Sequence, residues 1–164
     1  MGGVLLLLFA VIVGTGLGYN AHPPSNVETI DSARLHLNPE FAEANLGTRM
    51  NADNRGVTVT VIAQQYAFVP NCIVVPTDTP VTFRVASGDV IHGFLIQGTN
   101  VNTMVVPGYV STLKAVFPRA AERLMPCHEY CGPGHQAMWA RVRIVDRNEF
   151  PFAEARTRSV SCAR

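Results

Sequence analysis

Apolar and polar residues follow two different patterns along this 164-residue chain. Residues 2–19 form one apolar run without a charge, whereas from residue 57 onward short apolar runs alternate with turn residues. Such short, regularly spaced runs, rich in Val, Ile, Thr and Phe, predict an antiparallel β-sandwich or barrel. The runs are VTVTVIA, CIVVP, PVTFRVAS, VIHGFLIQ, VNTMVVP, VSTLKAVF and MWARVRIV.

The same pattern divides the chain into segments. TFRVAS and STLKAVF alternate apolar and polar residues, as strands with one solvent-facing side do. We therefore expect a β domain over residues 57–145. Residues 20–56 are polar and rich in Pro, Asn and Gly, which indicates a connector, with a short helix near 39–45. Residues 146–164 form a charged tail in which the strand pattern fades.

The N-terminal run predicts a single transmembrane helix over residues 2–19. Eighteen residues at ~1.5 Å each cover roughly 27 Å, just short of a ~30 Å hydrocarbon core. A cleaved secretory signal is the alternative, although the positive start and small-residue cleavage site of such a signal are missing. A soluble core helix is a further reading. Either of the first two places the remaining residues outside the cytoplasm.

Composition narrows the function classes. The length suits one domain plus an anchor or tail. The formal net charge of +1 gives no electrostatic reason to expect nucleic-acid binding.

Four soft-metal ligands lie within the twelve residues CHEYCGPGHQAM, which are Cys127, Cys131, His135 and Met138. Thiolate and thioether together select copper or an iron–sulfur cluster, and imidazole suits copper or zinc. Thioether is not among the usual zinc ligands. A loop between two strands of a rigid sandwich can impose its geometry on a metal, so copper is expected here.

A second histidine completes the pattern. His92 lies in the strand-like run VIHGFLIQ, and one Cys, two His and a weak Met form a blue-copper set. Cys127 is an additional thiolate beyond that set. Two cysteinates can bridge two copper ions, which then share one positive charge when an electron is lost. No ligand position is left for a substrate, so the pattern predicts an electron relay.

The motif CHEYCGPGHQAM, together with GDVIHGF upstream and the N-terminal run, closely resembles subunit II of haem–copper cytochrome c oxidases. The single anchor and the run YAFVPNCIVVP are similar to the B family of these oxidases. The resemblance implies an all-β, cupredoxin-like Greek-key sandwich that carries a binuclear copper centre, CuA. The ligands that it implies are His92, Cys127, Glu129, Cys131, His135 and Met138.

The resemblance also implies roles and partners. Cys127 and Cys131 would bridge the coppers, His92 and Met138 would complete one ion, and His135 with the Glu129 carbonyl would complete the other. A c-type cytochrome would donate electrons, and the haem of subunit I would accept them. Subunit I, not this chain, would reduce oxygen and pump protons. The chain would lie in a bacterial or archaeal plasma membrane, with the copper domain on the periplasmic or outer face.

Some features depart from the family pattern. B-family members often carry Gln where Glu129 stands, and in other oxidases a Glu there also reaches a Mg or Mn ion at the subunit I interface. The main alternative is a stand-alone copper-binding or copper-delivery cupredoxin with one exchangeable ion. A nitrous oxide reductase would need a further large catalytic domain, and quinol-oxidase subunits have lost the copper ligands.

Two cysteines remain outside the copper pattern. Cys72 begins a strand-like run, and Cys162 lies in the tail. Free thiols tend to pair in an oxidising compartment, so a Cys72–Cys162 disulfide is expected. A buried Cys72 with a free Cys162, or an intermolecular link, stays open, because a bridge needs Cα atoms within about 7 Å.

Overall fold

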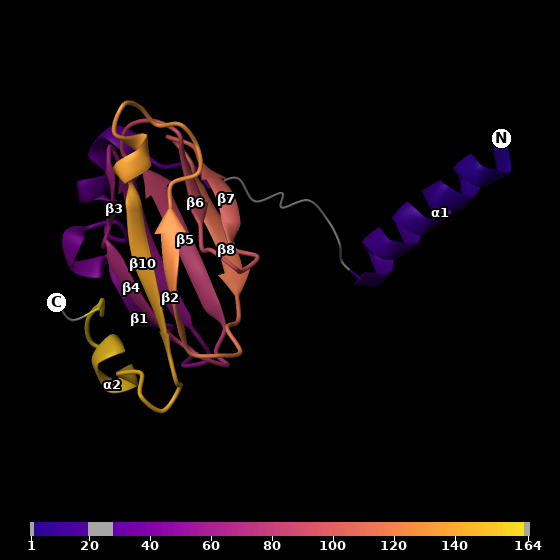
Figure 1. Ribbon diagram of the computed structural model, residues 1–164. Coiled ribbons are helices and arrows are strands. Elements are labelled where there is room, and N and C mark those ends of the chain that lie inside the picture. Colours follow the sequence, from indigo (N-terminus) through magenta and orange to yellow (C-terminus); the bar gives the residue numbers. More distant parts are fainter. Residues whose placement is uncertain (1, 20–27, 163–164) are drawn as a thin grey trace.

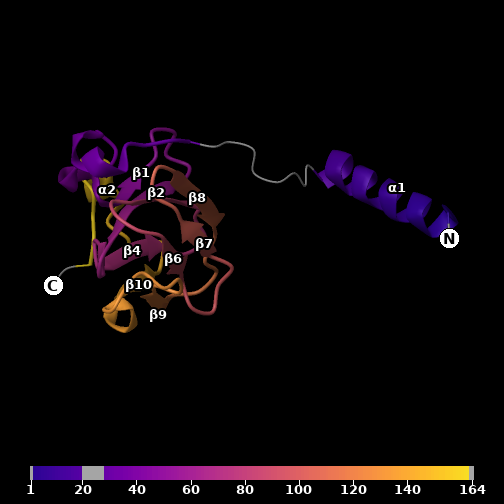
Figure 2. The ribbon, with the colours of Figure 1, turned by 90° about the horizontal axis from the view of Figure 1, so that it is seen from above.

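A computed structural model describes residues 2–19 and 28–162. Residues 28–162 form a two-layered β-sandwich (Figures 1 and 2). One sheet has the strand order β1 (Gly47–Met50), β2 (Val57–Gln64), β5 (Val81–Ser87) and β8 (Val110–Ala115), and β3 (Ala67–Val69) also pairs with β2. The other has the order β4 (Cys72–Pro76), β10 (Trp139–Val145) and β9 (Ala121–Pro126). β6 (His92–Leu95) and β7 (Asn102–Val105) pair with each other in a separate two-stranded sheet.

Each of the seven apolar runs contains a strand, and the alternation in β5 and β8 matches their burial patterns. The expectation of a purely antiparallel sandwich is wrong, because β2 pairs with β5 in parallel and β4 pairs with β10 in parallel. The reason is topological. The chain passes from β2 through β4 in the opposite sheet before it returns to β5, and such a crossover permits parallel neighbours.

The core lies between the two sheets. The inward positions of β2 and β5 are fully buried, and the rings of Phe83 and Phe94 pack with their centroids 5.7 Å apart. Phe68 meets Phe94 edge to face at 5.9 Å. This packing fixes β6, and with it His92, against the end of the sandwich where β9 finishes.

Segments on both sides of residues 57–145 pack onto the sandwich. Leu35, near the end of the 3₁₀ helix η1 (Ser32–Leu37), and Phe41, ahead of the 3₁₀ helix η2 (Glu43–Asn45), are buried. β1 also lies in the range expected to be a connector. At the other end, α2 (Phe152–Ala155) and the residues around it bury Phe150, Ala155 and Val160.

The expected disulfide is confirmed. Cys72 and Cys162 are bonded, with Cα atoms 5.4 Å apart. The bridge joins the start of β4 to the C-terminal segment, whose backbone also pairs Val160 with Thr48 of β1. The C-terminal segment therefore closes the sandwich between β1 and β4.

Residues 2–19 form the helix α1 (Gly2–Tyr19), whose aliphatic side chains between Val4 and Val13 are exposed. Among the described helices, none meets the combined length and apolarity expected of a bilayer crossing.

Candidate metal centre

Two neighbouring antiparallel strands hold the ends of the motif loop together. Pro126 at the end of β9 pairs with Trp139 at the start of β10, and the Cys127 N–H donates to the Met138 carbonyl (2.9 Å). Cys127 and Met138, eleven positions apart in sequence, therefore face each other at the base of the loop. The loop lies at one end of the sandwich, and α2 lies at the opposite end (Figure 1).

The tip of the loop folds back over this base. The short 3₁₀ helix η3 (His135–Ala137) returns the chain to β10, so that His135 turns toward Cys131. Gly132 adopts φ +128°, a backbone conformation that favours glycine. A Cβ at Gly132 would also lie only 2.6 Å from the Tyr66 hydroxyl oxygen, so the aromatic ring packs directly on the loop backbone.

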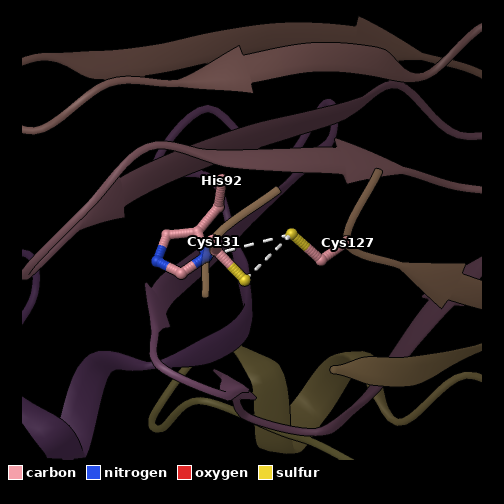
Figure 3. Close-up of side chains that lie close together, drawn as sticks. All are labelled: His92, Cys127 and Cys131. Carbon is pink, nitrogen blue, oxygen red and sulfur yellow. Dashed lines mark hydrogen bonds between the residues drawn. The ribbon is translucent and has the colours of Figure 1, made fainter. Parts of the chain in front are cut away.

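The donor atoms of the predicted ligands converge. The Sγ atoms of Cys127 and Cys131 are 3.9 Å apart, and His92 Nδ1 is 3.9 Å from Cys127 Sγ (Figure 3). A metal–thiolate bond of about 2.3 Å lets one ion touch both sulfurs at this separation. His92, Cys127 and Cys131 thus form a group able to hold a metal ion.

The other predicted donors adjoin the same two sulfurs. His135 Nδ1 lies 3.6 Å from Cys131 Sγ, and Met138 Sδ lies 3.7 Å from it. The Glu129 carbonyl oxygen lies 3.2 Å from Cys127 Sγ. All six sequence-predicted positions therefore meet at one place. His92 and Met138 are almost entirely buried, with 0 % and 1 % of their surface exposed, whereas His135 is partly exposed.

The electrostatic setting of the thiols opposes charge while no metal is bound. Burial raises the pKa of Cys131 to about 11, and the charge of the neighbouring Cys127 thiolate contributes to this rise. Metal binding must therefore displace a proton from this thiol. The Gly93 N–H donates to Cys127 Sγ (3.5 Å) and so helps to fix the position of this sulfur. The donor set, its spacing and its burial all fit soft copper ions.

Asp89 contributes to the site although it is not among the ligands predicted from the sequence. Its Oδ1 lies 2.8 Å from His92 Nε2, so the imidazole donates there and presents Nδ1 to the sulfurs. Burial raises the pKa of Asp89, but hydrogen bonds from His92 and from two backbone N–H groups outweigh it and lower the pKa overall. In the sequence, the only indication of this contact between Asp89 and His92 is that the Asp stands three residues before the His.

Two aromatic residues near the site, Tyr66 and Phe68, differ in their surroundings. Phe68 is buried in the core, whereas Tyr66 is partly exposed and lies against the loop. The neighbouring Gln65 side chain donates to the Cys131 carbonyl, which ties the loop to the turn after β2. Trp139 is half exposed beside Met138.

Comparison with known proteins decides the family. The family model for the periplasmic domain of cytochrome c oxidase subunit II matches residues 46–145 of this chain. The chain belongs to the cytochrome c oxidase subunit II family. Cytochrome c oxidase subunit 2 of Thermus thermophilus is 34 % identical over 145 residues, covering 87 % of this chain and 86 % of that protein. A second Thermus thermophilus sequence of the same name is 36 % identical over 124 residues, covering 76 % and 91 %.

Two solved structures share the fold of this chain. A chain of a haem–copper terminal oxidase dimer superposes with a TM-score of 0.62 at 25 % identity, covering 87 % of this chain and 92 % of that one. The periplasmic domain of cytochrome oxidase subunit II from Bradyrhizobium japonicum shares the fold, with a TM-score of 0.52 at 21 % identity over 56 % and 86 % of the two chains. This subunit II is thus a cupredoxin-like part of an oxidoreductase complex, and its electron-transfer role follows from the family.

Proposed function

We propose that this subunit II holds a binuclear copper centre, CuA, and relays single electrons from a c-type cytochrome to the haem of oxidase subunit I. The observation that supports the proposal is the convergence of two thiolates, two imidazoles, a thioether and a carbonyl. Each of these donors lies 3.2–3.9 Å from a cysteine sulfur.

The arrangement of donors supports two ions rather than one. Each sulfur has one imidazole and one weaker donor beside it: His92 and the Glu129 carbonyl adjoin Cys127, whereas His135 and Met138 adjoin Cys131. In the proposed assignment His92 and Met138 complete one ion, and His135 and the Glu129 carbonyl complete the other. Cys127 and Cys131 would hold both ions, and each ion would also have one imidazole ligand. A blue-copper site would leave Cys127 without a role.

When bound, the copper pair would supply a reversible one-electron couple. The chain itself supplies rigidity and dryness. β9 and β10 hold both ends of the loop, Asp89 fixes the ring of His92, and burial leaves only 6 % of Cys127 and 4 % of Cys131 exposed to water. Because these donors are held by packing, little rearrangement accompanies a change of charge, which favours fast electron transfer.

The proposal extends to the surroundings of the domain. α1 would anchor the chain in the bilayer of a bacterial or archaeal plasma membrane as a single pass, with the copper domain on the periplasmic or outer face. The partly exposed Glu129 carboxylate would be available to a Mg or Mn ion at the subunit I interface. Membership of the B family stays a prediction that rests on the run YAFVPNCIVVP.

Copper analysis and electron paramagnetic resonance of the purified chain test this function. We expect two coppers per chain and, after one-electron oxidation, a spectrum in which one unpaired electron is shared by both nuclei. One copper with a four-line hyperfine pattern would contradict the binuclear centre. One exchangeable copper would instead favour a stand-alone copper-binding or copper-delivery protein.

A further inference from the structure

A surface hollow reaches the buried ligands from outside. It has a volume of about 290 Å³, and its walls include Leu124, Pro126, Gln136 and Trp139. Its floor is formed by Cys127, His135 and Met138, three of the proposed copper ligands. Leu124 and Trp139 are 45 % and 50 % exposed, so the mouth opens to solvent although Cys127 and Met138 are buried.

Two other approaches to the ligands are filled by tight packing. On the side of β6, Gly93 lies so close to the loop that an added Cβ would be 2.7 Å from His128 Cγ. On the side of the loop tip, an added Cβ at Gly134 would be 2.5 Å from the Tyr66 ring. Ions cannot pass between groups in such contact without displacing the backbone. The hollow beside Trp139 needs no such displacement.

We propose that this hollow is the port through which Cu⁺ reaches the metal centre of the folded chain. The inference rests on the proposed copper function and adds the route of loading. Cu⁺ is a soft cation, which suits the thioether and thiolate on the floor and the aromatic face of Trp139 on the wall. The Arg141 guanidinium lies 5.8 Å from the Trp139 ring centroid and helps to hold that wall in place.

The order of donors supports stepwise capture. Met138 and the partly exposed His135 line the hollow, so an ion that enters it meets a thioether and an imidazole first. Cys131 Sγ lies directly behind them, at 3.7 Å from Met138 Sδ and 3.6 Å from His135 Nδ1. An incoming Cu⁺ leaves the ligands of its carrier for these groups and then binds the thiolates. Each cysteine releases one proton to solvent, and no electron is transferred.

The test measures the rate of loading instead of electron transfer. Metal-free, reduced full-length chain is mixed with Cu⁺ supplied as its acetonitrile complex, and bound copper is measured after quenching with a chelator. Leu124→Lys places a positive charge at the mouth of the hollow. Val116→Lys is the matched control, because Val116 is also well exposed to solvent but follows β8 at the opposite end of the sandwich.

We expect Leu124→Lys to load Cu⁺ roughly threefold or more slowly than Val116→Lys at low salt, from Coulomb repulsion at the mouth. The difference should shrink at high salt, because the added charge is screened. Both variants should reach the same final copper content and spectrum. Equal loading rates at low salt would overturn the port and leave the binuclear function intact, whereas failure of the unmodified chain to bind two coppers would overturn the function itself.

Gln136→Lys provides an independent variant if Leu124→Lys does not fold, since Gln136 also lines the hollow and is exposed in the short helix η3. It should slow loading in the same salt-dependent way. A rate equal to that of Val116→Lys would again overturn the port.

Discussion

At the scale of single residues, the donor atoms of the metal centre are aimed by neighbours that are not ligands themselves. Asp89 turns the Nδ1 atom of His92 toward the sulfurs, and the Gly93 N–H contacts Cys127 Sγ. Gln65 holds the Cys131 carbonyl. Ligands fixed in this way need little reorientation when the metal binds, so changes to the supporting residues should alter affinity and potential.

Replacing Asp89 with Asn tests this support. The change keeps the size of the side chain but removes the negative charge that accepts the hydrogen bond from His92 Nε2. We expect copper affinity to fall by roughly tenfold to a hundredfold and the reduction potential to rise. Competition with a chelator and redox titration measure both. Asp53→Asn, in the turn after β1, is the control, and equal affinities in the two variants would exclude a role for the Asp89 charge.

Replacing Cys127 with Ser separates a binuclear from a mononuclear site. His92, Cys131, His135 and Met138 would remain, and these form a blue-copper set. We therefore expect one copper per chain, loss of the shared-electron spectrum and loss of oxidase activity, with the fold retained. Electron paramagnetic resonance and circular dichroism follow these outcomes. Normal electron transfer in the variant would show that Cys127 is not a bridging ligand.

Met138 should affect the reduction potential of the site more than its ability to retain copper. A thioether binds copper weakly, and its main effect is on potential. Met138→Leu should therefore shift the reduction potential and slow electron transfer while both coppers stay bound. Met104→Leu, at an exposed methionine of β7, is the control and should change neither quantity. Loss of copper from Met138→Leu would assign Met138 a larger structural part.

At the scale of secondary-structure elements, the hairpin formed by β9 and β10 gathers the ligands. The sequence predicts the loop and β10 well, because the clustered metal ligands are followed at once by the apolar run MWARVRIV, whereas β9 lies outside the seven predicted runs. It does not predict the position of His92, since a lone strand histidine carries no partner information. The packing of Phe94 against Phe68 and Phe83, together with the hydrogen bond from the Gln97 N–H to the Leu124 carbonyl, places β6 beside β9 and the loop.

Another element-scale feature lies where the N-terminal residues join the domain. Arg84 of β5 makes ion pairs with Glu28 (2.6 Å) and Glu40 (2.7 Å). These pairs tie two segments that precede β1 to the first sheet. The hydrogen bond and charge of Arg84 lower the pKa of Glu28, although slight burial opposes them.

The pH dependence of this clamp can be predicted. A lowered pKa means that the ion pair stabilises the fold above the ordinary value of 4.5 and that this stability is lost as pH falls through the folded-state pKa. Because Glu28 is half exposed, the contribution is at most about 1 kcal/mol. Glu28→Gln should lower the urea midpoint at pH 7, and its midpoint should converge with that of the unmodified chain below about pH 4. Glu43→Gln, at an exposed position, is the control. A difference in urea midpoint between Glu28→Gln and the unmodified chain that persists below about pH 4 would show that the difference does not come from the ion pair with Arg84.

At the scale of the whole molecule, the ends of the chain contribute more to the sandwich than their composition indicates. The C-terminal nineteen residues contain few apolar side chains, yet Phe150, Ala155 and Val160 are buried. The apolar stretch FPFAEA (150–155) is too short to show a strand or helix period, and Val160 stands alone between polar residues, so no pattern marks them as core. Their burial depends on the backbone pairing of Val160 with Thr48 and on the disulfide.

The disulfide should therefore stabilise the whole domain. Cys72 and Cys162 are 90 residues apart, for which the chain-entropy model gives roughly 4–5 kcal/mol as an upper figure. The buried side chains of the C-terminal segment retain part of its attachment without the bridge. We therefore expect Cys162→Ser to lower the free energy of unfolding by about 2–4 kcal/mol. Ser161→Ala, at the neighbouring exposed position, should change it little.

Thiol chemistry and denaturation together test this prediction. Denatured, copper-free chain without reductant should show two reactive thiols, and peptide mapping should join Cys72 to Cys162. Reductant should lower the urea midpoint of the unmodified chain to that of Cys162→Ser and leave the variant unchanged, because the variant has no bridge to lose. Four reactive thiols, or a midpoint insensitive to reductant in the unmodified chain, would show that the C-terminal segment is held by packing and backbone hydrogen bonds alone.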